Sequence, residues 1–177
     1  GNAAINDLIA KNWGPVSGAT TAQMQSEMDR LAQVLGSGSG NPKKGKSLYM
    51  QNCGRCHLLF EEGGRIGPDL TPFKRDNQER ILTNIVNPGL EIREGFENHV
   101  VVTIDGRVLN GFLADKDNQV LVLRGVDGQN VVLRHDEIEE MQVSKVSIMP
   151  EGTMKGLSDQ QVRDLFAYLR SSQPVNY

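Results

Sequence analysis

Apolar residues recur at helical spacing in the first part of the chain. Residues 3–13 have an apolar side chain every three to four positions, which predicts an amphipathic helix. Thr20 or Thr21 can cap a second helix. Its apolar face consists of Met24, Met28, Leu31 and Leu35, which we expect to pack rather than to bind a ligand. The segment at 36–42, "GSGSGNP", has the composition of a flexible linker, so residues 1–40 are predicted to be a two-helix extension that ends in a linker.

Three further segments carry helix start and stop signals. Residues 42–53 begin with a proline, which is favoured in the first helical turn. Another helix is expected to start at Asp76, with Glu79 completing a capping box, and to stop at "NPG" (87–89). Residues 158–169 repeat this pattern as the last helix. The apolar faces comprise Ile81, Leu82, Ile85 and Val86 in one helix, and Val162, Leu165, Phe166 and Leu169 in the last.

The apolar period changes from helical to alternating between residues 97 and 140. The segments there are rich in valine and are divided by Asp-Gly pairs at 105–106 and 127–128, which are strong signals for hairpin turns. We expect four to five short strands in an antiparallel meander that forms a curled sheet or small barrel. The chain is thus predicted to be mainly helical, with an inserted β module.

Composition and charge exclude several classes of protein. A chain of 177 residues can bury one core and leave room for a smaller second unit. The net charge of −3 gives no basic footprint for nucleic acid. No apolar run approaches membrane-spanning length, and no signal peptide precedes the first predicted helix. Because the chain begins at Gly1 without a methionine, we expect it to be a piece of a longer protein, with any export signal outside it.

Both cysteines of the chain lie in "CGRCH", as Cys53 and Cys56, directly before His57. A structural zinc site needs four ligands, and the remaining candidates are His99 and His135 in the β segment. A redox dithiol favours a βαβ context with the first cysteine at a helix start, whereas this motif follows a helix. C-x-x-C-H is the attachment signature of c-type haem, which we favour: two thiols add to the haem vinyl groups and the histidine meets the iron.

The segments around this motif resemble class I cytochromes c. "GKSLYMQNCGRCH" is similar to the first helix of that family, with Gly45 at its close helix crossing, and "DLFAYLRS" is similar to its last helix. In "RIGPDL" the resemblance implies that the carbonyl of Pro68 holds the ring of His57. The family would place the sixth iron ligand in a loop before the last helix, where "SIMPEG" supplies Met149. Met154, a histidine or an open position remain alternatives.

The order of motifs resembles a more specific family. From His57 to Met149 is 92 positions, and the β segment at 97–140 accounts for most of this length. The arrangement over residues 42–173 resembles the planctomycete/verrucomicrobial-type haem-binding domain, which commonly ends large secreted proteins. We therefore expect a cytochrome c domain at 41–177, interrupted by the β module just before the loop of the methionine ligand.

The resemblance implies an electron-transfer domain with one covalent haem c, and not an enzyme. Its partner would be a redox protein or a fused dehydrogenase. A haem enzyme or gas sensor with an open or labile sixth site is the alternative. Residues 97–140 carry nine acidic and four basic side chains, so we expect no nucleic-acid binding. Because thioether attachment takes place outside the energy-conserving membrane, we expect a bacterial periplasmic or exported protein. The oligomeric state is not predicted.

Overall fold

The computed structural model describes residues 21–176, and the predicted helix at 3–13 lies outside this range. The described residues form two compact units. The first, which we call the β unit, comprises Glu91–Met149. The second, which we call the helical unit, comprises the described residues of Ala19–Leu90 and Pro150–Tyr177. None of the helices described is long and apolar enough to cross a membrane.

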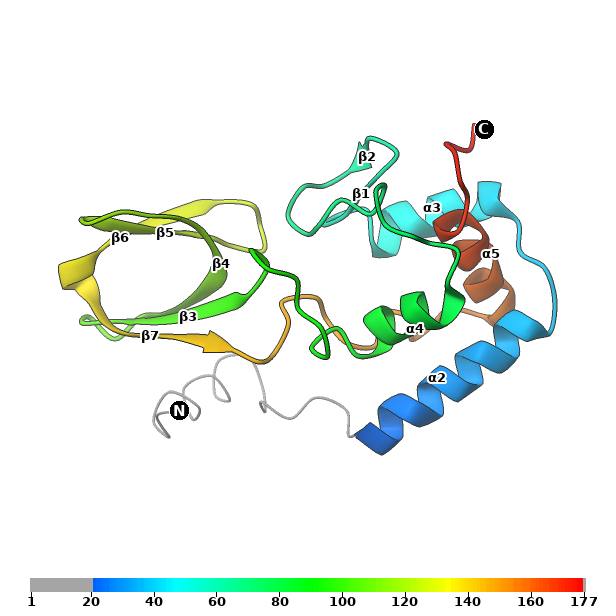
Figure 1. The fold of residues 1–177 in the computed structure, drawn as a ribbon, viewed down its shortest axis with the longest axis horizontal. Coiled ribbons are helices and arrows are strands. Elements are labelled where there is room, and N and C mark those ends of the chain that lie inside the picture. Colours follow the sequence, from blue (N-terminus) through cyan, green and yellow to red (C-terminus); the bar gives the residue numbers. More distant parts are fainter. Residues whose placement is uncertain (1–20, 177) are drawn as a thin grey trace. The chain divides into compact units, whose positions relative to one another are not determined.

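The helical unit contains the four α-helices of the described residues (Figure 1). They are α2 (Thr21–Gly36), α3 (Pro42–Asn52), α4 (Gln78–Val86) and α5 (Asp159–Leu169). Helix α3 packs against α5, and α2 contacts both α4 and α5. The described part of the predicted N-terminal extension is therefore integrated into this unit, because its buried side chains Leu31 and Val34 contribute to a shared interior.

Most of the predicted helix ends are confirmed. Asn41 caps α3, with its Oδ1 accepting the backbone N–H groups of Lys43 and Lys44 at 2.9 and 3.3 Å. Ser158 and Gln161 form the expected capping box of α5. The start of α4 was predicted wrongly, because its N-cap is Asn77 rather than Asp76. Both residues can accept a backbone hydrogen bond, so local sequence does not discriminate between them.

The predicted linker at 36–42 packs against α5. A Cβ atom on Gly40 would lie 2.0 Å from the carbonyl oxygen of Arg163. The backbone N–H of Asn41 donates to Asp164 Oδ1 at 2.7 Å, and Gln160 Nε2 donates to Ser39 O at 3.3 Å. Glycine and serine suggested flexibility, but here the missing side chains permit close contact with a helix.

Helices α3 and α5 meet through backbone contact. A Cβ atom on Gly45 would lie 1.9 Å from the carbonyl oxygen of Asp164, so only glycine fits at this crossing. One turn further along α3, the ring centroids of Tyr49 and Tyr168 are 5.4 Å apart, and both side chains are buried. The close crossing expected at Gly45 is confirmed.

A short hairpin that the sequence did not predict follows α3. Strands β1 (Leu58–Leu59) and β2 (Glu62–Gly63) pair antiparallel. The turn between them consists of Phe60 and Glu61, both with positive φ (53° and 67°). Such turns normally carry asparagine or glycine, which is why the sequence gave no hairpin signal here.

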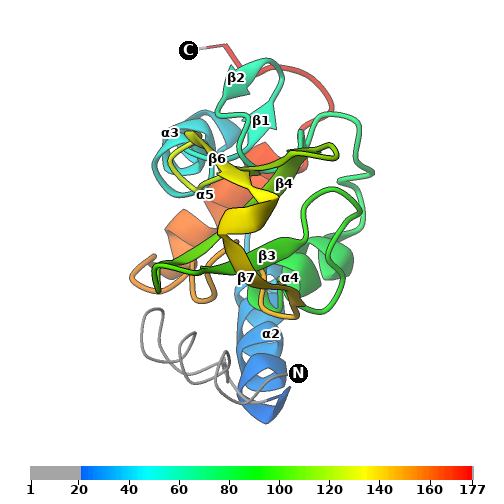
Figure 2. The ribbon, with the colours of Figure 1, turned by 90° about the vertical axis from the view of Figure 1, so that its left-hand side faces the viewer.

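The β unit contains a five-stranded antiparallel sheet in the order β6-β5-β4-β3-β7. Its strands are β3 (Asn98–Thr103), β4 (Val108–Lys116), β5 (Val120–Arg124), β6 (Asn130–Arg134) and β7 (Ile138–Ser144), with a 3-10 turn η1 (His135–Glu137) before β7. The sheet curls, so that β5 and β6 face β3 and β7 (Figures 1 and 2). Five strands agree with the prediction, but the unit extends beyond 97–140 and the last strand pairs with the first.

An aliphatic cluster fills this unit. It consists of Val101, Leu121, Leu123 and Leu133, each at most 2% exposed. The two predicted hairpin turns are present, with Gly106 and Gly128 at φ values of 83° and 79°. Helix and strand are both substantial in the described chain, so "mainly helical" fits the helical unit alone.

Candidate functional site

The Cys53–His57 segment forms a tight loop at the end of α3. The N–H groups of Cys53 and Gly54 both donate to Tyr49 O, at 2.8 and 2.7 Å. The N–H groups of Cys56 and His57 donate to Cys53 O at 3.1 and 2.9 Å. This winding brings two thiols and an imidazole together within about one turn of backbone.

The ring of His57 is held by two contacts and its backbone by a third. Its Nδ1 lies 2.9 Å from the carbonyl oxygen of Pro68, a contact that selects the tautomer in which Nδ1 carries the proton. Tyr49 Oη donates to His57 O at 2.6 Å. A Cβ atom on Gly67 would lie 2.8 Å from His57 Cε1, so the ring rests against bare backbone. Within the described residues Nε2 makes no hydrogen bond and is left for a ligand.

Burial sets the protonation of the loop. It lowers the pKa of His57, while the hydrogen bond to Pro68 acts in the opposite direction. A neutral imidazole is the form that binds a metal. Burial, followed by repulsion from Cys56, raises the pKa of Cys53 to about 12. Cys53 is therefore a thiol rather than the reactive thiolate of a redox dithiol.

The two alternatives to haem have little structural support. Cys53 is the C-cap of α3, whereas a reactive dithiol profits from a helix N-terminus. No group of three or more His, Cys, Asp or Glu side chains that could hold a metal ion occurs in residues 21–176. Both cysteines are free and half-buried. The donor set therefore suits thioether attachment better than a zinc site or a dithiol.

Arg75 ties the loop after His57 to the end of α5. Its Nη1 donates to Leu70 O and Thr71 O at 2.5 and 2.6 Å. Its Nε donates to Leu169 O at 2.8 Å and its Nη2 to Ser171 O at 3.0 Å. The guanidinium also lies 4.9 Å from the ring centroid of Phe60. Nothing in the sequence around Arg75 indicated this role, because its partners at the end of α5 are more than 90 positions away.

The candidates for a sixth ligand differ in their surroundings. Met149 is half-buried and is the last residue of the β unit. Its backbone N–H donates to Ser147 Oγ at 3.1 Å. Met154 belongs to the helical unit and is 3% exposed. His99 and His135 lie in the β unit, where their rings contact backbone carbonyls of Glu97 and Asp117 at 3.1 and 2.8 Å.

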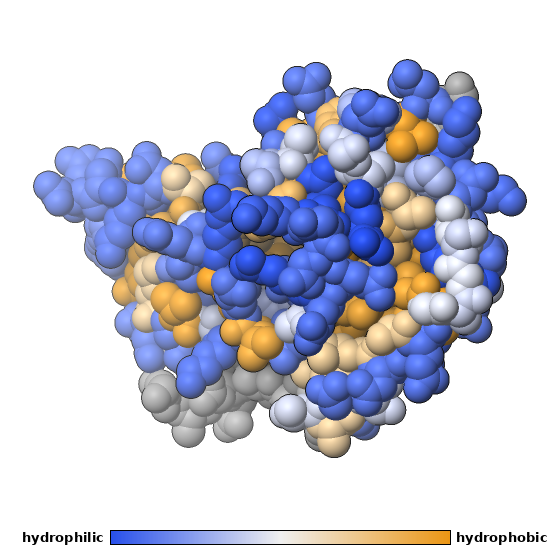
Figure 3. All heavy atoms as spheres, turned by 45° about the vertical axis from the view of Figure 1, so that its right-hand side comes forward, coloured by the Kyte–Doolittle hydropathy of each residue, from blue (hydrophilic) through white to orange (hydrophobic). Residues whose placement is uncertain are grey.

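The helical unit contains apolar side chains that could cover a haem. Half-buried apolar side chains follow the cysteine loop: Ile66 and Leu70 lie before α4, and Ile81 lies in it. Apolar side chains of this unit also reach the surface among hydrophilic ones (Figure 3). The buried Oγ1 of Thr153 lacks a hydrogen-bond partner. Cys53, Cys56 and His57 would hold the haem, and the apolar residues would cover its faces.

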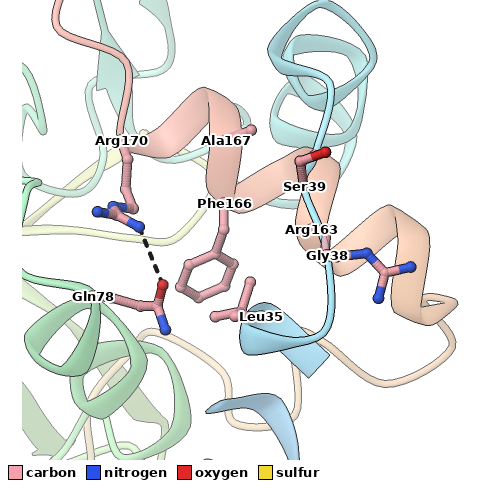
Figure 4. A pocket seen from close by; sticks show the side chains of 9 residues that line it. Leu35, Gly38, Ser39, Gln78, Arg163, Phe166, Ala167 and Arg170 are labelled. Atoms are coloured by element: carbon pink, nitrogen blue, oxygen red, sulfur yellow. Dashed lines mark hydrogen bonds between the residues drawn. The ribbon is translucent and has the colours of Figure 1, made fainter. Parts of the chain in front are cut away.

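A separate small hollow lies beside the connection between α2 and α3. It has a volume of about 180 Å³, and Leu35 and Phe166 point toward one another in it (Figure 4). Arg170 Nη1 donates to Gln78 Oε1 at 3.1 Å across one side. This hollow contains none of the predicted site residues.

One protein family matches part of the chain. The model of the family described as cytochrome c oxidase, cbb3-type, subunit III, matches residues 40–98. The match contains Cys53, Cys56, His57 and Pro68 and ends before Met149. None of the curated proteins matches the chain. Together with the geometry of the attachment loop, the family match supports a cytochrome c haem-binding domain in this chain, and such a domain implies haem-based electron transfer.

Proposed function

We propose that this chain is an electron-transfer domain in which one haem is bound covalently through Cys53 and Cys56, with His57 and Met149 as axial ligands. The observation that carries the proposal is the loop itself: two free thiols next to a neutral imidazole whose Nδ1 contacts Pro68 O at 2.9 Å. When bound, a haem iron exchanges one electron with a partner.

Each residue of the proposed site has a separate role in binding the haem. Cys53 and Cys56 retain the cofactor, and Pro68 and Gly67 orient the His57 ring so that Nε2 is presented. Met149 supplies a thioether, which gives a higher potential than a stronger donor would. With His57 and Met149 both bound to the iron, the haem would offer no site for a substrate, and the domain would have no catalytic residues of its own.

We further propose a cytochrome c fold with an inserted β unit, of the planctomycete/verrucomicrobial type. The order of motifs, with a five-stranded sheet between the attachment loop and the Met149 segment, supports this. The electron donor would be an attached or partner dehydrogenase. The proposed location is periplasmic or exported, because thioether attachment takes place there.

The visible spectrum of the purified protein tests the proposal. A pyridine assay should show a c-type haem with two thioethers, and the oxidised protein should show the weak red band of an iron–sulfur bond. Met149→Ala should abolish that band and lower the midpoint potential, while the matched variant Met154→Ala should retain both. The reverse result would assign Met154, and a protein without haem would refute the proposal.

Carbon monoxide separates electron transfer from the alternative of a haem enzyme or sensor. A ferrous iron with methionine bound should resist the gas near neutral pH, and Met149→Ala should bind it promptly. Prompt binding by the unaltered protein would favour an open or labile sixth site.

A further inference from the structure

Tyr49 contacts both ends of the attachment loop. Its backbone carbonyl oxygen accepts the N–H groups of Cys53 and Gly54 at 2.8 and 2.7 Å, where the loop starts. Its hydroxyl donates to the carbonyl oxygen of His57 at 2.6 Å, where the loop ends. Every residue type has a backbone carbonyl and could make the first contact. The second contact depends on the side chain, because it needs a donor at the tip of an aromatic ring.

Packing fixes the phenol of Tyr49 in place. The residue is buried, as is Tyr168 of α5. Their ring centroids are 5.4 Å apart, with the ring planes tilted by 55°. Burial raises the pKa of Tyr49 above its ordinary value, so the hydroxyl keeps its proton and acts as a neutral donor. The helix pair α3–α5 thus presents a fixed hydrogen-bond donor to the end of the attachment loop.

The hairpin after the loop confines the same carbonyl group. A Cβ atom on Gly63 would lie 2.2 Å from His57 O, and the N–H of Gly64 donates to Gly54 O at 2.8 Å. The peptide group of His57 therefore lies close to both the phenol and the hairpin backbone. The imidazole extends from this backbone, and its Nδ1 lies 2.9 Å from Pro68 O. A displaced peptide would therefore change the contact between the ring and Pro68.

We propose that Tyr49 is a positioning residue for His57: its hydroxyl fixes the histidine's peptide group and thereby keeps the ring in its hydrogen bond with Pro68. This inference rests on the haem binding proposed above. A histidine that donates its second ring N–H is a more basic ligand. A more basic ligand favours ferric iron and lowers the midpoint potential. Loss of the Tyr49 hydroxyl should therefore weaken the bond from Nδ1 to Pro68 and raise the potential.

The test uses the haem-loaded protein with Tyr49→Phe, which keeps the ring that packs on Tyr168 and removes only the hydroxyl. Paramagnetic proton NMR of the ferric protein reports how fast the Nδ1 proton of His57 exchanges with water, and a redox titration reports the potential. We expect faster exchange and a higher potential. The matched control Tyr168→Phe removes the hydroxyl from the other ring of the pair, and it should leave both readouts unchanged.

A second variant restores the donor. Tyr49→para-aminophenylalanine places an N–H group at the tip of the ring, so it should return exchange and potential to the values of the unaltered protein. It also replaces the phenylalanine variant if that protein does not fold. Altered readouts in the amino variant would overturn the inference.

The outcomes for Tyr49 and for haem binding are separable. Should Tyr49→Phe bind haem and leave exchange and potential unchanged, the positioning role is overturned while haem binding stands. Equal shifts in Tyr168→Phe would also overturn it, because loosening of the helix pair would then be sufficient to move the ring. An unaltered protein without haem overturns the proposed function itself.

Discussion

The two units use glycine in different ways. In the helical unit, Gly40 and Gly45 allow backbone to touch backbone, since a Cβ atom on either would come within 2.0 Å of a carbonyl oxygen of α5. In the β unit, Gly106 lies in open space, and its role is its positive φ of 83°. The first use depends on distant neighbours and the second only on local conformation.

Both interiors contain buried polar groups. In the helical unit, Lys46 Nζ donates to Glu62 Oε1 at 2.7 Å. In the β unit, Asn98 Nδ2 donates to Val146 O at 3.2 Å, in addition to the aliphatic cluster. The difference between the units therefore lies in their glycines and not in whether polar groups are buried.

Gly45→Ala should have the largest effect. The new Cβ would overlap the carbonyl of Asp164, 1.9 Å away, and would force α3 from α5. We expect a loss of about 3 kcal/mol or more in the free energy of unfolding, measured by denaturant titration of helical circular dichroism. Gly106→Ala in the β unit should cost only about 1 kcal/mol through backbone strain. Equal losses would erase the contrast between the units.

Replacing Arg75 by lysine should have the second-largest effect on the free energy of unfolding. Lysine cannot reproduce a fork of donors to five carbonyl oxygens, on Leu70, Thr71, Phe73, Leu169 and Ser171. Leaving these carbonyls, most of them part-buried, without their donor should lower the unfolding free energy by about 2–3 kcal/mol. Arg170→Lys, which gives up one exposed bond to Gln78, should change it by less than about 0.5 kcal/mol. A similar cost at both positions would show that Arg75 does not stabilise the connection between the loop after His57 and the end of α5.

Gly67→Ala should act on the site more than on stability. Its Cβ would lie 2.8 Å from His57 Cε1 and push the ring away from Pro68 O. We expect a cost of about 1–2 kcal/mol together with a changed absorption spectrum and potential. Gly156→Ala, where the added Cβ has nothing within 4 Å, should leave the spectrum intact. An unperturbed spectrum in Gly67→Ala would mean that the ring has room to move.

Glu61→Gly should produce the smallest change, and it should stabilise. Glu61 has a φ of 67° in the hairpin after His57, a conformation that costs a residue with a side chain about 1 kcal/mol relative to glycine. The gain should be about 0.5–1 kcal/mol and appear as a higher melting temperature. A decrease would indicate that the turn relaxes without strain.

Short-range signals were sufficient for much of the fold. The caps of α3 and α5, the hairpin turns at Gly106 and Gly128 and the alternating burial of β5 all follow from interactions within a few residues. Strand β3 departs from this pattern, because it is buried along its whole length. The start of α4 was misplaced by one residue, because Asp76 and Asn77 are equally good caps locally. The hairpin at Phe60–Glu61 was missed because its residues are poor formers of such a turn.

By itself, the sequence determined which reactive groups are available, namely two thiols and a histidine at the spacing of a haem attachment motif. It also determined the family match that supports a cytochrome c haem-binding domain. The resemblance already implied the contact between Pro68 O and the His57 ring. Only the tertiary structure decided that Gly67 lies against that ring, that α2 and its connection pack on α5, and that Arg75 binds carbonyls at the end of α5. The reason is physical. A motif is written in neighbouring residues, but a contact such as Arg75 with Leu169, 94 positions apart, exists only once the chain has folded.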